Sequence, residues 1–142
     1  MAKNKLFLED YFNFDLVGLV SVAREYKLVW SLNQVTDFQL VKQDDITLEF
    51  SGNHKISVSN FDFKKEHQRV SLLKNRLVAK PTTDYQFLIS ELKQFDYLLK
   101  YQDETGDHPI KDILSLIKTS PEIDYAAILD PSMIKSRDNL IF

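Results

Sequence analysis

Residues 87–101, FLISELKQFDYLLKY, constrain the fold more than any other part of the sequence. This segment sets two carboxylates, Glu91 and Asp96, among apolar residues and closes on Tyr and Leu residues that suit a strand. We expect a turn at Ser90–Gln94 that leads into a central strand at Phe95–Tyr101. The segment then joins a sheet with one helix, formed by the residues before it, to a second helix and a final strand after it.

The first half begins with a strand and a helix. Phe14–Ala23 is rich in Val and Leu, which predicts a strand buried on both faces. Gly18 in its middle indicates a bulge or the close approach of a neighbouring element. Arg24–Thr36 is expected to be an amphipathic helix, and Trp30 lies outside its apolar stripe, so its side chain should be partly exposed or covered by another element. The stripe consists of Leu28, Val29, Leu32 and Val35.

A meander of strands follows the helix. Ile46–Phe63 alternates apolar and polar residues around a turn at Ser51–His54, which predicts a β-hairpin. The alternation changes phase at residues 60–61, and we expect a bulge or a sharp twist there. Arg69–Val78 is predicted to be a third strand, and the Pro-containing segment 79–84 a loop.

The second half contains the clearest helical pattern, which begins at Pro109 and is stopped by Pro121. Its apolar stripe consists of Ile110, Ile113, Leu114 and Ile117. A strand at Ile123–Leu129 follows. Together these elements predict a single α+β domain over residues 1–142, with a mainly antiparallel sheet of five to six strands and two packed helices.

The composition excludes several classes of protein. The absence of Cys excludes disulfides, thiol nucleophiles and Cys-based metal sites. A net charge of −3 with interspersed signs argues against a nucleic-acid partner. No apolar run is long enough to span a membrane, and residues 1–13 lack the apolar core of a signal peptide, so we expect a cytoplasmic protein. The shape of residues 1–13 stays open between a short strand and a terminal turn.

Glu91 and Asp96 invite an acid–base interpretation, but they are five residues apart. That spacing sets them on opposite faces of a strand and about 140° apart on a helix, so they do not form a facing pair. Together with Tyr97 they could instead be the polar groups of a ligand-binding site. The structural alternative, which the spacing favours, is that Glu91 braces the turn and Asp96 accepts hydrogen bonds from the backbone or a Tyr.

No other pattern in the sequence predicts a catalytic residue, a metal site or a cofactor. His54, His67 and His108 fall in two turns and at a helix start, and none has a second His at i+2 or i+4. There is no Gly-rich phosphate loop and no nucleophile elbow.

The motif Ile89-Ser90-Glu91 followed by Asp96-Tyr97 resembles the signature of the IPExxxVDY family of small bacterial proteins. Ser90 stands where the family has Pro, and Phe95 where it has Val. The resemblance continues towards both ends of the chain, and the family carries no assigned activity, so it implies a fold without a mechanism. The further matching segments are Phe14–Gly18, Tyr26–Leu28, Trp30, Leu32-Asn33, Asp130-Pro131 and Lys135–Phe142.

These observations favour a non-enzymatic interaction or regulatory module, which forms a homodimer through an exposed sheet edge or an aromatic patch. The alternative is a small-ligand-binding or enzymatic domain with an aromatic-lined pocket near residues 87–101 that includes Glu91, Asp96 and Tyr97. A sheet that stacks RNA bases on aromatic side chains is a third hypothesis, and the acidic balance argues against it.

Overall fold

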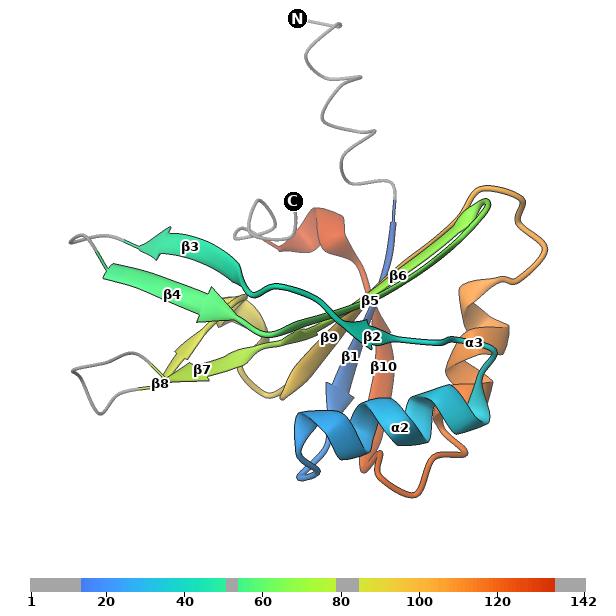
Figure 1. Cartoon of the computed structure of the whole chain (residues 1–142), viewed down its shortest axis with the longest axis horizontal. Helices are drawn as coiled ribbons and strands as arrows, with labels where there is room; N and C mark the ends of the chain where they lie inside the picture. The colour runs from blue at the N-terminus through green and yellow to red at the C-terminus, as the bar shows by residue number, and fades with distance from the viewer. Residues whose placement is uncertain (1–13, 51–53, 79–84, 135–142) are drawn as a thin grey trace, which may run out of the picture.

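The computed structural model describes residues 14–50, 54–78 and 85–134, and it has the expected α+β architecture (Figure 1). Six antiparallel strands form one sheet in the order β10-β1-β9-β6-β5-β2. These strands are β1 (Asp15–Val20), β2 (Val41–Lys42), β5 (Asn60–Lys65), β6 (Gln68–Lys74), β9 (Tyr97–Asp103) and β10 (Tyr125–Leu129). The predictions for residues 1–13, 51–53, 79–84 and 139–142 lie outside the described residues.

Two short ribbons, two helices and two 3-10 turns complete the described fold. The ribbons pair β3 (Ile46–Phe50) with β4 (His54–Val58), and β7 (Arg76–Val78) with β8 (Tyr85–Phe87). The helices are α2 (Glu25–Val35) and α3 (Ile110–Ile117), and the 3-10 turns are η1 (Ser90–Leu92) and η2 (Pro131–Met133). Neither helix is long and apolar enough to cross a membrane.

β1 pairs with β9 and β10 along its two edges, and it is buried on both faces, as its sequence predicts, because an apolar cluster packs on each side of the sheet. Leu16 points to one face of the sheet and Val17 to the other, and both side chains are fully buried. Gly18 marks the expected close approach. A Cβ atom at this position would lie 2.6 Å from the Phe95 ring, so the ring fills the space that a side chain would need.

The turn before the central strand is also present. η1 covers its first residues, and the Phe95 N–H donates to the Leu92 carbonyl over 2.9 Å. β9 then runs between β1 and β6, although it begins at Tyr97, two residues later than predicted. The later start follows from the turn, because Phe95 is still bonded to it.

Both helices pack on the same face of the sheet and share one core with it (Figure 1). α2 contributes Leu28 and Leu32, and α3 contributes Ile113 and Ile117, against Leu99 of the central strand. Burying a side chain of this kind stabilises the fold by about 1.5–3 kcal/mol. Two polar groups between the helices pair with each other, since the hydroxyls of Ser31 and Ser120 lie 2.6 Å apart.

The opposite face is covered by irregular chain. Leu88, Ile89 and Phe95 pack there against sheet residues such as Leu73 and Leu98. Because these covering residues lie outside any helix, their backbone groups need partners from elsewhere. We refer to the two sides of the sheet as the helical face and the loop face.

The change of phase at residues 60–61 has a different cause from the bulge or twist that we expected. The hairpin ends with β4, and after Ser59 the chain joins the main sheet as β5. The predicted strand over residues 69–78 is likewise two strands, β6 and β7, which separate at Asn75. The Lys74 N–H donates to the Ser59 carbonyl over 3.4 Å, so both chains leave the sheet side by side.

Candidate functional site

The structure separates the three residues that the sequence marks as a site. Glu91 is exposed on η1, whereas Asp96 and Tyr97 lie at the start of β9 and bind the segment that leads into α2. The Asp96 Oδ2 accepts the Ser21 N–H at 3.0 Å, and the Tyr97 hydroxyl donates to the Ala23 carbonyl at 3.0 Å. Asp96 and Tyr97 therefore fix the chain at the entrance to α2.

The electrostatics of Tyr97 fit this structural role. Burial, together with the nearby charges of Glu25 and Asp96, raises its pKa to about 12. The hydroxyl is thus protonated at neutral pH, where it is a hydrogen-bond donor and not a base. Asp96 also faces Arg76, with 3.6 Å between Oδ1 and the guanidinium nitrogen.

An open cleft of about 710 Å³ lies at the amino-terminal end of α2, and we call it the α2 cleft. Phe61 and Tyr97 are its buried aromatic residues. Glu25 lines it as well, but its carboxylate contacts the Ser59 hydroxyl and lies 3.6 Å from the Lys74 ammonium. The one acid of the cleft is thus engaged with a hydroxyl and a cation.

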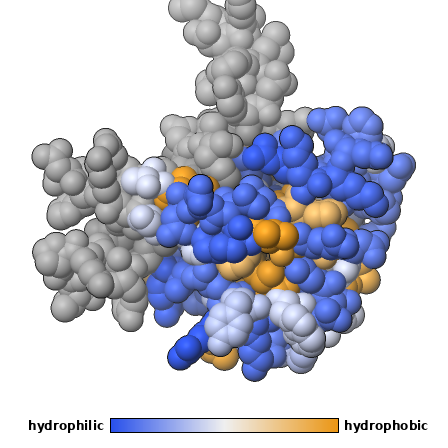
Figure 2. Space-filling view, in the orientation of Figure 1, coloured by the Kyte–Doolittle hydropathy of each residue, from blue (hydrophilic) through white to orange (hydrophobic). Residues whose placement is uncertain are grey.

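Large apolar side chains continue from this cleft along the outer surface of α2. Val22 is 94% exposed, Tyr26 69% and Trp30 65%, and we call these residues the α2 stripe. Figure 2 shows hydrophobic and weakly polar surface gathered over this region within a mostly hydrophilic face. The exposure of Trp30 agrees with its predicted position outside the apolar stripe of the helix. The periodicity of the sequence did not predict that Val22 and Tyr26 would be exposed beside Trp30.

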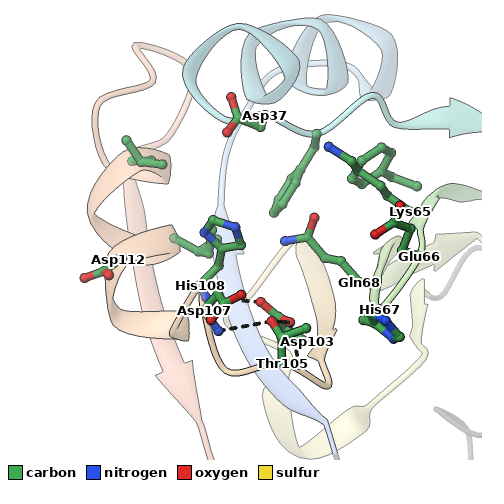
Figure 3. A pocket seen from close by; sticks show the side chains of 14 residues that line it. Asp37, Lys65, Glu66, His67, Gln68, Asp103, Thr105, Asp107, His108 and Asp112 are labelled. Atoms are coloured by element: carbon green, nitrogen blue, oxygen red, sulfur yellow. Dashed lines mark hydrogen bonds between the residues drawn. The ribbon is translucent and has the colours of Figure 1, made fainter.

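A second cleft of about 320 Å³ lies at the other end of α2, and we call it the acidic cleft (Figure 3). The segments that line it come from the chain after α2 (37–38), the β5–β6 turn (63–68), the β9–α3 loop (103–108) and α3 (112–116). Pairing of β6 with β9 sets Gln68 opposite Asp103 and so brings these loops together. No short-range sequence pattern carries that information.

The acidic cleft contains two of the three histidines, His67 and His108. The His67 Nδ1 lies 3.5 Å from a carboxylate oxygen of Glu104, and both side chains are exposed. Among the residues that the structure describes, no group of three His, Asp or Glu side chains is placed to hold a metal ion. The chemistry of this cleft therefore rests on its charges, its amide and its aromatic rings.

Comparison with known proteins does not assign a role to either cleft. No protein-family model matches the chain, and no curated protein is similar to it in sequence. The resemblance to the IPExxxVDY family therefore stays a prediction from the motif residues, and the function has to be argued from the surface of the molecule.

Proposed function

We propose that this protein is a non-enzymatic interaction module that forms a homodimer through the α2 stripe. One observation carries the proposal: Tyr26 and Trp30 are 69% and 65% exposed on a helix whose inner face is fully buried. Tyr and Trp supply much of the energy at protein interfaces, because they bury a large area with little loss of side-chain freedom. Their exposure in the monomer leaves that energy available to a partner.

A second copy of the chain is the partner that this surface fits. Tyr26 and Trp30 are one helical turn apart, so two antiparallel copies of α2 can stack Tyr26 of each copy against Trp30 of the other. Such a contact is closed and two-fold, and it ends after two subunits. Val22 at one end of the stripe would extend the apolar area towards the α2 cleft.

The outer edge of β10 is the competing route to a dimer. β10 ends the sheet among the described strands, and Tyr125 is 58% exposed on it. The Tyr125 ring is already stacked on Phe95, with centroids 6.3 Å apart, so part of its area is used within the subunit. Within the described part of the chain, the α2 stripe makes no such internal stack, and it is the better candidate.

Sedimentation and fluorescence test the proposal together, because Trp30 is the only Trp in the sequence. The wild-type chain should sediment as a dimer at micromolar concentration and dissociate on dilution. The emission of Trp30 should shift to shorter wavelength over the same concentration range, as the indole leaves water. Tyr26→Ser should shift both transitions to higher concentration, by about tenfold or more for a residue at the centre of an interface.

Tyr125→Ser is the matched control, since it removes an exposed Tyr from β10 and leaves α2 intact. It should leave the dimer unchanged. A chain that stays monomeric at all concentrations contradicts the homodimer. A dimer that is lost only in Tyr125→Ser assigns the interface to the sheet edge.

The alternative function, binding of a small ligand near residues 87–101, has one observation in its favour. Tyr97 belongs to the lining of the α2 cleft, with Phe61 beside it. A ligand there would quench or shift the emission of Trp30 without a change in sedimentation. Fluorescence titration at a concentration where the chain is monomeric separates this function from self-association.

A further inference from the structure

The acidic cleft shares no lining residue with the α2 cleft or with the α2 stripe. We propose that it binds an organic cation that carries N–H donors on a short apolar stem, such as an alkylammonium or alkylguanidinium group. The cation could be a free small molecule or a Lys or Arg side chain of another protein, and the chemistry of recognition is the same. Three properties of the cleft lead to this class of ligand.

The first property is an aromatic floor of suitable size. The volume of about 320 Å³ is at the lower end of small-molecule sites. Phe38 and Phe63 line it, with ring centroids 6.0 Å apart, and Tyr101 lies behind Phe38 at 6.1 Å. Such rings cover an apolar stem and attract a cation through their faces.

The second property is an amide whose orientation is fixed by its neighbours. The Tyr101 hydroxyl donates its proton to the His108 carbonyl over 2.7 Å, so it must accept from Gln68, whose Nε2 lies 3.0 Å away. This arrangement commits the amide nitrogen of Gln68 to Tyr101 and leaves Oε1 as an acceptor. Figure 3 shows the Gln68 side chain in the middle of the cleft, where a ligand N–H could reach that oxygen.

The third property is the charge of the lining. It includes five carboxylates and a single lysine, Lys65. The carboxylates are Asp37, Glu66, Asp103, Asp107 and Asp112. Asp103 is held in place because it accepts the N–H groups of Thr105 at 3.0 Å and His108 at 3.1 Å. The hydrogen bond from the Thr105 hydroxyl, 2.6 Å from Oδ1, lowers the pKa of Asp103 most, and the two backbone bonds act in the same direction, so the charge persists at neutral pH.

Binding can be measured by NMR, with three probes that share a short alkyl stem and differ in the charge of the polar head group. Butylguanidinium should bind with a dissociation constant on the order of 1 mM, as expected for so small a ligand. The resonances that move should be those of the Gln68 side-chain amide and of residues 103–108. Neutral butylurea and anionic butyrate should bind at least about tenfold more weakly, because the lining carries net negative charge.

Variants of the lining test which groups are responsible. Asp107→Asn should weaken binding of butylguanidinium about two- to fivefold, as expected for one exposed charge. Phe63→Leu keeps an apolar side chain and removes an aromatic face, and it should weaken binding by a similar factor. Asp44→Asn changes the charge equally but lies outside the cleft, so it should have no effect. The amide spectrum of each variant shows whether it is folded.

A short peptide with one Arg, blocked at both ends, separates the two sources of the cation. Binding of both peptide and butylguanidinium, or of either one alone, supports the proposed site and identifies its source. Failure of both to move these resonances overturns the proposal, and so does equal binding of butylurea or butyrate. The outcome does not depend on whether the chain dimerises through α2.

Discussion

The two faces of the sheet are covered in different ways, and each cover solves a different problem. On the helical face, α2 and α3 satisfy most of their own backbone groups, so apolar packing supplies most of what holds them. On the loop face, Leu88, Ile89 and Phe95 are buried without a helix around them. There the fold depends on side chains that bond to the backbone.

Asn75 is the clearest of these side chains. It is fully buried at the point where β6 ends, and its amide nitrogen donates to the carbonyls of Leu92 and Phe95 over 2.9 and 3.0 Å. Its Oδ1 accepts the Ile89 N–H at 2.8 Å. One residue thus supplies partners to three points of the turn.

Residues 89–97 and the two candidate binding clefts also belong to different parts of the molecule. The motif residues Ile89 and Phe95 belong to the loop face, and Asp96 and Tyr97 support the entrance to α2. The acidic cleft and the α2 cleft both include aromatic residues of the helical face. The pattern of residues 89–97 is therefore accounted for by folding, while the candidate binding surfaces lie on the helical face and at its margins.

Asn75→Ala should destabilise the loop face, and we expect it to have the largest effect on the free energy of unfolding. The buried Ile89 N–H and Phe95 carbonyl lose their Asn75 partner, and the Leu92 carbonyl keeps only the Phe95 N–H, which should lower the free energy of unfolding by about 3–5 kcal/mol. Chemical denaturation measures the loss. Asn33→Ala is the matched control on the helical side, since that Asn bonds only Leu40, at 2.9 and 3.2 Å. An equal loss in both variants would contradict the special position of Asn75.

Gly18→Ala should destabilise the same face by about 2 kcal/mol, because the new methyl group collides with the Phe95 ring. Phe95→Val removes the ring and should make the alanine tolerable. In the double variant the cost of the alanine should then fall to near zero, as a double-mutant cycle would show. If the two changes are additive, the ring is not what excludes a side chain at position 18.

Much of the sheet and both helices follow from the sequence because their signals are local. The apolar stripes of α2 and α3, the buried β1 and the turn before β9 each depend on residues close in the chain. The phase change at residues 60–61 marks the break after Ser59 without revealing its cause, and no local pattern marks the break at Asn75. A strand that changes sheets keeps its composition, and only its partner reveals the change.

The candidate sites were harder to predict for the same reason. The exposure of Trp30 follows from its place on the helix, whereas the acidic cleft requires the register of β6 against β9. Glu91, Asp96 and Tyr97 drew attention because they are polar groups in apolar sequence. The same pattern arises wherever a polar side chain supplies a hydrogen-bond partner to a buried backbone group. Here two of the three residues, Asp96 and Tyr97, bond to the backbone.

Tyr97→Phe tests the helical face at the entrance to α2. It removes the hydrogen bond to the Ala23 carbonyl and should lower the free energy of unfolding by about 1 kcal/mol. Tyr26→Phe removes an exposed hydroxyl at the same cleft and should change stability by less than about 0.5 kcal/mol. Urea denaturation of both variants compares them. If both lose stability equally, the bond to Ala23 contributes nothing measurable.

Lys100→Met should change the free energy of unfolding the least. It should raise this free energy, whereas the other variants lower it. Lys100 projects onto the loop face, 4.8 Å from the centre of the Phe14 ring. Burial lowers its pKa to about 8, the charge of Arg69 acts in the same direction and that of Asp62 opposes it. Between about pH 8 and the ordinary pKa of 10.5, the unfolded chain therefore binds more protons, and the wild-type protein gains stability as the pH rises.

Below pH 8 the folded protein bears the full cost of this charge, reduced by screening because the side chain is partly exposed. Lys100→Met removes that cost and should stabilise the protein by about 1 kcal/mol at pH 7, less whatever the contact with Phe14 contributes. The advantage should shrink as the pH approaches 10.5, the ordinary pKa of the side chain. Lys111→Met, an exposed lysine on α3, is the control and should show no such trend. A difference for Lys100→Met that stays constant with pH would mean that packing, and not the buried charge, separates the two proteins.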